Sequence, residues 1–187
     1  MDNGSLSDEE TIIRNCLNGD ADSYSVLVNR YKTMVYNMAF RMVGDEDTAK
    51  DLAQESFIAA YKGLGQFRFG SKFSSWLYSI ALNKCRDHLK LEKDSVSTDE
   101  ISDIMPASGT SPERATAAEQ SKDILQRALD ALPVEYRQVL ILKHIEELDY
   151  QEIAGITGTS IPALKVRAHR GREMLKKILE EAGVNYG

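Results

Sequence analysis

Two Gly-Asp pairs divide the N-terminal half of this chain into long helical stretches: Gly19-Asp20 and Gly44-Asp45. Glycine ends a helix readily because it adopts the left-handed conformation without strain. An aspartate that follows can accept hydrogen bonds from the free amide groups of the next helix. A capping-box pattern at Ser7–Glu10 marks an earlier helix start. This punctuation predicts helices over about 7–17, 21–43, 46–62 and 72–90.

Composition supports a mostly helical chain divided into two parts. Of 187 residues 42% are hydrophobic, and only four prolines interrupt the helical spacing of Leu, Ala, Ile, Glu and Lys. Residues 92–118 change to Ser, Thr, Asp, Glu, Gly and Pro, as in a solvated linker. Ser111-Pro112 predicts a new helix start, and helices are predicted over about 112–131, 133–145, 150–156 and 161–181. We therefore expect an all-α protein with two small helical domains, 1–91 and 119–187, joined by a flexible acidic linker, 92–118.

The charge of the chain is unevenly distributed. The net charge is −6, whereas nucleic-acid-binding domains are usually basic. The stretch Leu164–Lys177 nevertheless carries six cations against the single acid Glu173. Because local charge decides which partner binds where, the negative total does not exclude DNA.

The C-terminal part has the pattern of a helix-turn-helix. A short helix, Tyr150–Ile156, precedes the tight connection Thr157–Ser160 and a longer second helix. Apolar residues at 161, 164, 168, 175 and 178, with Gly171 on the same line, form one buried stripe, and most cations lie off it. This geometry is typical of major-groove recognition. The alternative is a plain helical hairpin with a solvated basic face.

The predicted helix over 46–62 has two distinct sides. A core stripe is formed by Ala53, Phe57, Ala60 and Leu64. The opposite side presents Asp51, Gln54, Glu55 and Ile58. An acidic face with one exposed apolar residue can dock on a basic partner, although the pattern alone also fits a solvated face.

Aromatic residues alternate with cations in the segment Phe67–Tyr78. This combination suits single-stranded nucleic acid, because rings stack on bases while Arg and Lys hold the backbone. For Trp76 and Leu77, packing in the core is the competing explanation.

Several motifs in register resemble those of the extracytoplasmic-function sigma factors. Their order and spacing match over residues 8–90 and 119–180. The matching segments are Asp51–Phe57 (D-x-x-Q-E-x-F), Phe73–Asn83 (F-x-x-W-L-x-x-I-A-x-N), Leu132–Arg137 (L-P-x-x-x-R), Tyr150–Ala154 (Y-x-E-I-A) and Arg167–Arg172 (R-x-H-R-x-R).

The resemblance implies a non-enzymatic protein that directs core RNA polymerase to promoters. The expected partners are the β′ and β subunits of core polymerase, promoter DNA and an anti-sigma factor. No cofactor, metal or small-molecule substrate is expected. The resemblance assigns polymerase binding to Asp51, Gln54, Glu55 and Ile58. It assigns contacts with the −10 element, including a flipped base, to Arg68, Ser71, Lys72, Phe73, Trp76, Asn83 and Arg86. It assigns contacts with the −35 element to Ser160, Lys165, Val166, Arg167, His169 and Arg170.

Two other classes of function compete with this interpretation. A helix-turn-helix regulator would bind operator DNA without polymerase. An enzyme is disfavoured because the three histidines are dispersed and no nucleophile–base pair or phosphate loop occurs. Cys16 and Cys85 have no zinc-site spacing and are expected in the core. No apolar run approaches the roughly 20 residues of a membrane span, so we expect a cytoplasmic protein.

Overall fold

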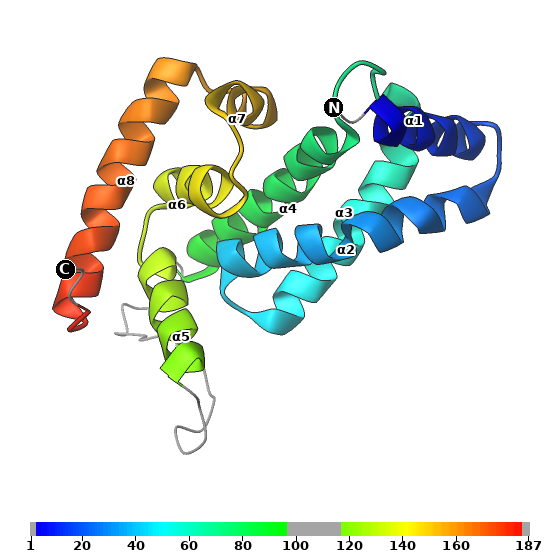
Figure 1. The fold of residues 1–187 in the computed structure, drawn as a ribbon. Helices are drawn as coiled ribbons and strands as arrows, with labels where there is room; N and C mark the ends of the chain where they lie inside the picture. The colour runs from blue at the N-terminus through cyan, green and yellow to red at the C-terminus, as the bar shows by residue number, and fades with distance from the viewer. Residues whose placement is uncertain (1–2, 97–116, 185–187) are drawn as a thin grey trace.

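The computed structural model describes residues 3–96 and 117–184, and the regular structure in these two ranges is helical (Figure 1). The all-α fold predicted from the sequence is confirmed. The first part contains α1 (Asn3–Leu17), α2 (Ala21–Val43), α3 (Glu46–Gly63), a 3-10 turn (Leu64–Gln66) and α4 (Phe73–Val96). The second part contains α5 (Ala117–Asp130), α6 (Val134–Leu140), a π-helical turn (Ile141–Ile145), α7 (Tyr150–Thr157) and α8 (Ile161–Glu181).

The two Gly-Asp pairs end one helix and start the next, as predicted. Asp20 accepts hydrogen bonds from the amides of Asp22 and Ser23 at the start of α2. Gly44 ends α2 with a φ of 78°, and its amide donates to the carbonyl of Phe40 at 2.7 Å. Asp45 then accepts from the Thr48 amide at 2.8 Å to open α3.

Three predicted boundaries differ from the structure or fall outside it. The first helix already begins at Asn3, so Ser7 lies inside it and is not its cap. The fourth helix continues to Val96 instead of ending near Lys90, because no glycine or proline interrupts residues 91–96. The expected helix start at Ser111-Pro112 lies outside the described residues.

In the first part, α2, α3 and α4 surround a common core. The predicted stripe of Ala53, Phe57, Ala60 and Leu64 is buried. Cys16 and Cys85 are buried free thiols, as expected. Burial raises the pKa of Cys85 to about 12, so this side chain remains a protonated thiol at neutral pH.

In the second part, α6 and α8 pack closely. Of the predicted stripe of α8, Leu164, Ala168 and Gly171 are buried, whereas Ile161, Leu175 and Ile178 are half-buried. A β-carbon on Gly171 would lie 3.2 Å from Cγ of Leu140 in α6 and 3.3 Å from Cβ of Tyr136. Glycine therefore lets these two helices approach each other at this point.

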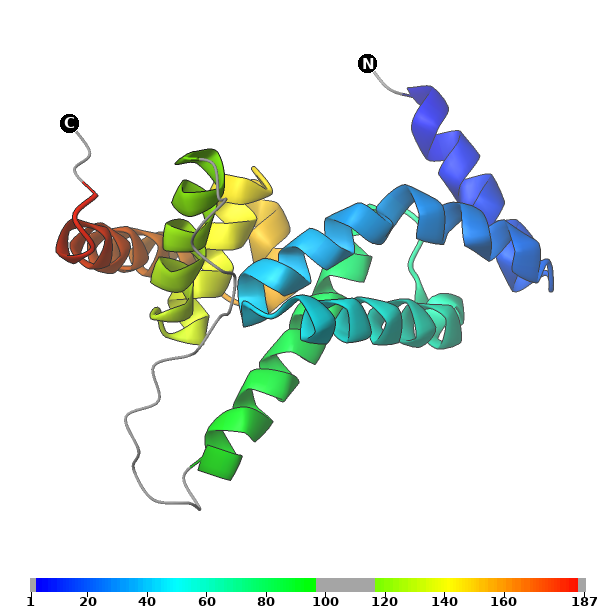
Figure 2. The ribbon, with the colours of Figure 1, turned by 90° about the horizontal axis from the view of Figure 1, so that it is seen from below.

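The two parts share one hydrophobic core. Buried residues of the second part, including Ile141, Ile153 and Leu164, belong to the same cluster as those of α2, α3 and α4. Helix α5 contacts α2, and α7 contacts α4; Figure 2 shows the second part seated against the C-terminal end of α2. The sequence gives no indication of this arrangement.

Polar side chains complete this contact at the end of α2. The amide of Gln126 lies 3.3 Å from the carbonyls of both Phe40 and Arg41. The buried guanidinium of Arg137 donates to the Met42 carbonyl. It also donates to the backbone oxygens of Asp130, at 2.5 Å, and Leu132, at 3.3 Å. The last carbonyls of a helix lack partners within it, so Gln126 and Arg137 supply partners for the carbonyls of Arg41 and Met42. The Phe40 carbonyl accepts from both Gln126 and the Gly44 amide.

Replacing Arg137 with Met tests this contact, because Met keeps much of the apolar stem and removes every donor. We expect the free energy of unfolding to fall by about 2–4 kcal/mol, since buried carbonyls lose their partners. Urea unfolding followed by circular dichroism measures the change, with the exposed Arg127→Met as the matched control. Equal stability of the two variants would contradict the role given to Arg137.

Candidate partner and nucleic-acid interfaces

The four residues predicted to bind polymerase share the exposed side of α3, but they fall into two sets. Gln54 and Ile58 line a groove of about 720 Å³ between α2 and α3. Asp51 and Glu55 lie outside the lining, and Glu55 forms a 3.0 Å ion pair with Lys84 of α4. The predicted acidic face is therefore the border of a groove.

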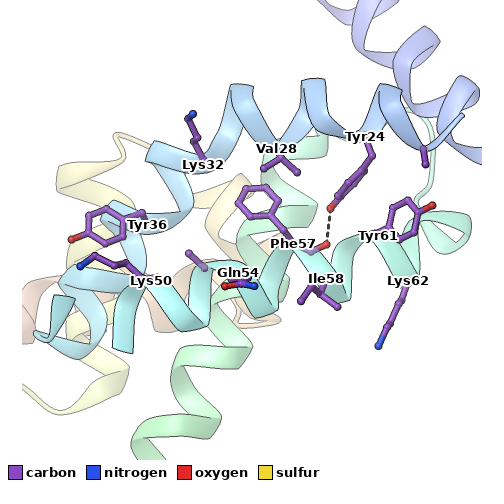
Figure 3. A pocket seen from close by; sticks show the side chains of 12 residues that line it. Tyr24, Val28, Lys32, Tyr36, Lys50, Gln54, Phe57, Ile58, Tyr61 and Lys62 are labelled. Carbon is purple, nitrogen blue, oxygen red and sulfur yellow. Dashed lines mark hydrogen bonds between the residues drawn. The ribbon is translucent and has the colours of Figure 1, made fainter. Parts of the chain in front are cut away.

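The groove has an apolar floor and a basic rim (Figure 3). Val28 of α2 and Phe57 of α3 lie between the two helices, and the Tyr24 hydroxyl donates to the Phe57 carbonyl at 2.7 Å. The rings of Tyr24 and Tyr61 are in contact, with centroids 4.8 Å apart. The cations of the lining are Lys32, Lys50 and Lys62.

Sequence reasoning missed the α2 side of this groove. Residues 24, 28, 32 and 36 follow each other at a spacing of four and so share one face of α2. The core residues Leu27, Val35 and Met38 lie on an adjacent face. The apolar arc of α2 is therefore wider than one core-facing stripe requires, and this width is the signal that could have identified the groove.

The aromatic, basic loop before α4 is a packed structure with an exposed edge. The ring of Phe67 contacts those of Phe69, Phe73 and Trp76, with centroids 5.5–5.6 Å apart. The guanidinium of Arg14 lies 4.4 Å above the ring of Phe69. These contacts hold the loop against α1 and α4.

The residues expected to contact the −10 element differ in accessibility. Phe73 is only 1% exposed and packs in the core, which argues against the direct DNA contact expected for it. Ser71 uses its hydroxyl within the loop, donating to the Arg68 carbonyl at 2.9 Å. Arg68 and Lys72 are exposed, and Trp76 is half-buried.

Asn83 and Arg86 lie further along α4, apart from the loop. Asn83 lies eleven positions after Lys72, which corresponds to about 16 Å along a helix. Both side chains are exposed and border a cleft of about 550 Å³, whose lining also includes Gln138 of α6 and Arg167 of α8. The structure therefore divides the residues expected at the −10 element between the loop and a face of α4 turned toward the second part.

The helix-turn-helix geometry follows from local hydrogen bonds. Asp149 and Glu152 form a reciprocal capping box at the start of α7. Gly158 ends this helix with a φ of 66°. Ser160 stands at the N-cap of α8 without a side-chain capping bond, and Pro162 occupies the first turn. Proline suits this position because its missing amide hydrogen would have no partner within the helix.

The outer face of α8 presents the residues expected at the −35 element. Lys165, Val166, His169 and Arg170 are exposed, with Val166 50% accessible. Arg167 is half-buried, and its guanidinium lies 3.4 Å from the Thr159 hydroxyl. The structure thus places Arg167 at the side of the face that the other four share.

The described helices include none long and apolar enough to cross a membrane.

Comparisons with known proteins agree with the two-part organisation. Residues 27–94 match the family model for sigma-70 region 2, and residues 122–175 match the model for sigma-70 region 4. The chain is 35% identical to the ECF RNA polymerase sigma factor SigW of Bacillus subtilis, over 90% of this chain and 95% of that protein. It is 31% identical to the RNA polymerase sigma-H factor of Pseudomonas aeruginosa, over 92% of this chain and 94% of that protein.

Solved structures share the fold at lower sequence identity. The sigma factor RpoE in complex with the anti-sigma factor NepR from Bartonella quintana aligns with a TM-score of 0.68 at 21% identity, covering 86% of this chain and 98% of that one. CnrH in complex with the cytosolic domain of CnrY aligns with a TM-score of 0.65 at 23% identity, covering 91% and 96%. With two sigma-70 regions in order along one chain and full-length relatives above 30% identity, this protein belongs to the extracytoplasmic-function sigma factors of the sigma-70 family.

Proposed function

We propose that this sigma factor docks on core polymerase through the α2–α3 groove and its acidic border. The aromatic, basic loop before α4, α4 itself and α8 then read the promoter. The observation that carries the proposal is the presence of an exposed apolar groove and an exposed cationic helix face on different parts of one chain. An operator-binding regulator would need only the second surface. The proposed docking surface is thus apolar, whereas the proposed DNA-reading surface is cationic.

The groove supplies the apolar part of the proposed polymerase contact. Ile58 is 47% exposed and borders the groove beside Gln54. Protein interfaces concentrate binding energy in a few central residues that become desolvated on binding. A partner helix with an apolar ridge fits the floor, and its flanking charges can meet the lysines of the rim and the acids Asp51 and Glu55.

The loop and α4 supply contacts with opened DNA. Arg68 and Lys72 can neutralise phosphates, and the half-buried ring of Trp76 offers a stacking surface. Asn83 carries both a donor and an acceptor and can pair with the edge of an unstacked base. Phe73 serves this surface by packing behind Phe67 and Trp76.

The exposed face of α8 supplies contacts with duplex DNA. Lys165, His169 and Arg170 project from the first half of the helix, where recognition helices reach base edges. Val166 can contact a thymine methyl group. Ser160 can donate to a phosphate, because its hydroxyl forms no capping bond.

An anti-sigma factor is part of this proposal. The RpoE structure that shares this fold was solved in complex with one. We propose that such a protein controls access of this sigma factor to polymerase.

Changing Ile58 to Asp tests the docking surface. We expect at least about a tenfold loss of affinity for core polymerase, because a carboxylate replaces an exposed apolar side chain of the groove lining. A fluorescence binding titration with core enzyme measures the affinity. Leu91→Asp makes the same chemical change at a residue that is 70% exposed and outside the groove, and should bind normally. Equal affinities for the two variants would refute the docking assignment.

Changing Asn83 or Arg68 to Ala tests promoter opening. Loss of a hydrogen bond or phosphate contact worth about 1 kcal/mol should reduce the opened fraction about fivefold while leaving core binding intact. Permanganate reactivity of unpaired thymines measures the opening, and the exposed Lys176→Ala serves as a control. Normal opening by both variants would remove the loop and Asn83 from the proposed site.

Changing Arg170 to Ala tests reading of the −35 element. A lost base contact should cost about 1–3 kcal/mol and relax specificity at one position. A lost phosphate contact should instead weaken all promoters and lower the salt slope by about one unit. Transcription from single-base −35 variants at two salt concentrations separates these results. Lys177→Ala, seven residues further along α8, is the control; an Arg170→Ala protein that matches it on every promoter would exclude Arg170.

A further inference from the structure

A cation of the proposed −10 surface is already bound to the other part of the protein. Nζ of Lys72 lies 2.5 Å from Oε1 of Glu152, the third residue of α7 in the helix-turn-helix. Hydrogen bonding to this carboxylate raises the pKa of Lys72. Lys72 is 66% exposed and Glu152 only 22% exposed, so the carboxylate is the better ordered partner.

The Glu152 carboxylate is held in place from its other side. Its Oε2 accepts a hydrogen bond from the Asp149 amide at 3.1 Å, as part of the capping box of α7. The Glu152 side chain therefore fixes the start of the helix-turn-helix and also binds Lys72 in the aromatic, basic loop before α4. A carboxylate fixed in this way loses little conformational freedom when it binds Lys72.

Neighbouring residues extend the contact over the first turns of α4. Trp76 and Ser79 face Gln151 and Gly155 of α7 across a cleft of about 390 Å³. The Tyr78 hydroxyl donates to the carboxylate of Glu146, which directly follows the π-helical turn. Figure 1 shows α7 lying beside the start of α4. A DNA strand that reaches the ring of Trp76 in this arrangement must enter the cleft between α4 and α7.

The contact between the two parts also restricts access to the residues expected at the −10 element that lie further along α4. Asn83 and Arg86 border the cleft that Arg167 of α8 closes from the opposite side. The cleft holds four cations, Arg86, Lys90, Lys93 and Arg167, against two acids, Asp87 and Glu135. The two DNA-reading surfaces thus meet at this cleft. Its cationic excess lies on α4, because Glu135 and Arg167 on the opposite wall offset each other.

We infer that the free protein is autoinhibited: Glu152 occupies the position of a DNA phosphate on Lys72, and α7 walls in the cleft that leads to Trp76 until the two parts separate. The inference rests on the proposed function of the loop. The α2–α3 groove stays open in this closed state, since Gln54 and Ile58 are exposed. Polymerase can therefore dock before the DNA-binding surfaces are released.

Replacing Glu152 with Gln weakens the contact with Lys72 and leaves the capping box of α7 in place. Gln can still accept the capping bond from the Asp149 amide. It lacks the charge that strengthens the bond to Lys72. Tyr78→Phe is a second variant, which removes the bond to Glu146 and keeps the buried ring. Glu180→Gln is the control, because Glu180 pairs with Lys176 at 3.7 Å on the exposed side of α8.

Trp76 is the only tryptophan in the sequence, so its fluorescence reports directly on this cleft. We expect acrylamide to quench Trp76 more strongly in Glu152→Gln and Tyr78→Phe than in the wild type. The same variants, free of polymerase, should bind a fluorescein-labelled, mixed-sequence single-stranded DNA oligonucleotide about two- to fivefold more tightly, as expected for loss of one partly exposed ion pair or hydrogen bond. The Glu180→Gln control should match the wild type in both measurements.

Unchanged quenching in both variants would overturn the inference, because the contact would then not restrict access to Trp76. Stronger quenching with unchanged DNA affinity would also overturn it, because the contact would not limit access to DNA. Run-off transcription by wild-type holoenzyme tests the proposed function separately, since it measures promoter use whether or not the free protein is closed.

Discussion

The arrangement of the two parts depends on the buried guanidinium of Arg137. It reaches from α6 to the Met42 carbonyl at the end of α2, and it also binds the backbone at Asp130 and Leu132 in its own part. A cation at this position opposes the negative end of the α2 dipole. Burial lowers the pKa of Arg137, and the nearby Asp130 carboxylate partly offsets this effect. Arg137 thus orders the turn between α5 and α6 and joins that turn to the first part. The contacts between α4 and α7 depend on the position that this junction gives to the second part.

Much of the fold could be predicted because its signals are local. Asp20, Gly44 and Asp45 act through neighbouring backbone groups, and their roles follow from the identity of two or three consecutive residues. The buried stripe of α8 is equally local, because a spacing of three and four residues defines one face of a helix. The π-helical turn at Ile141–Ile145 has no such signal, since its residues are ordinary helix formers. Its effect is to place Glu146 opposite Tyr78, a contact between residues 68 positions apart.

The candidate interfaces were predictable residue by residue but not as surfaces. Periodicity placed Gln54 and Ile58 on the exposed side of α3, yet the groove beside them also needs Val28 and Tyr24 from α2. Phe73 belongs to an aromatic, basic segment that suits DNA, but its place at the first turn of α4 turns the ring into the core. Sequence patterns give the face of a helix, whereas the packing of the next helix decides whether that face is covered. For the same reason nothing in the sequence pairs Lys72 with Glu152.

The closed arrangement also affects how tightly the free protein can bind DNA. If only a fraction of molecules is open, the apparent dissociation constant for DNA increases in inverse proportion to that fraction. The contacts that keep the parts together differ in strength along the interface. At the end of α2 they are buried and held by Arg137 and the shared core, whereas at Lys72 and Glu152 they are partly exposed and weakened by solvent. Separation is therefore easiest at the loop and the helix-turn-helix, the places where DNA must enter. Polymerase, docked on the groove, can favour the open state only if it also binds the second part more tightly when that part is released, because a ligand shifts an equilibrium by no more than its difference in affinity for the two states. A sigma factor built in this way couples DNA binding to polymerase binding through the two parts of one chain.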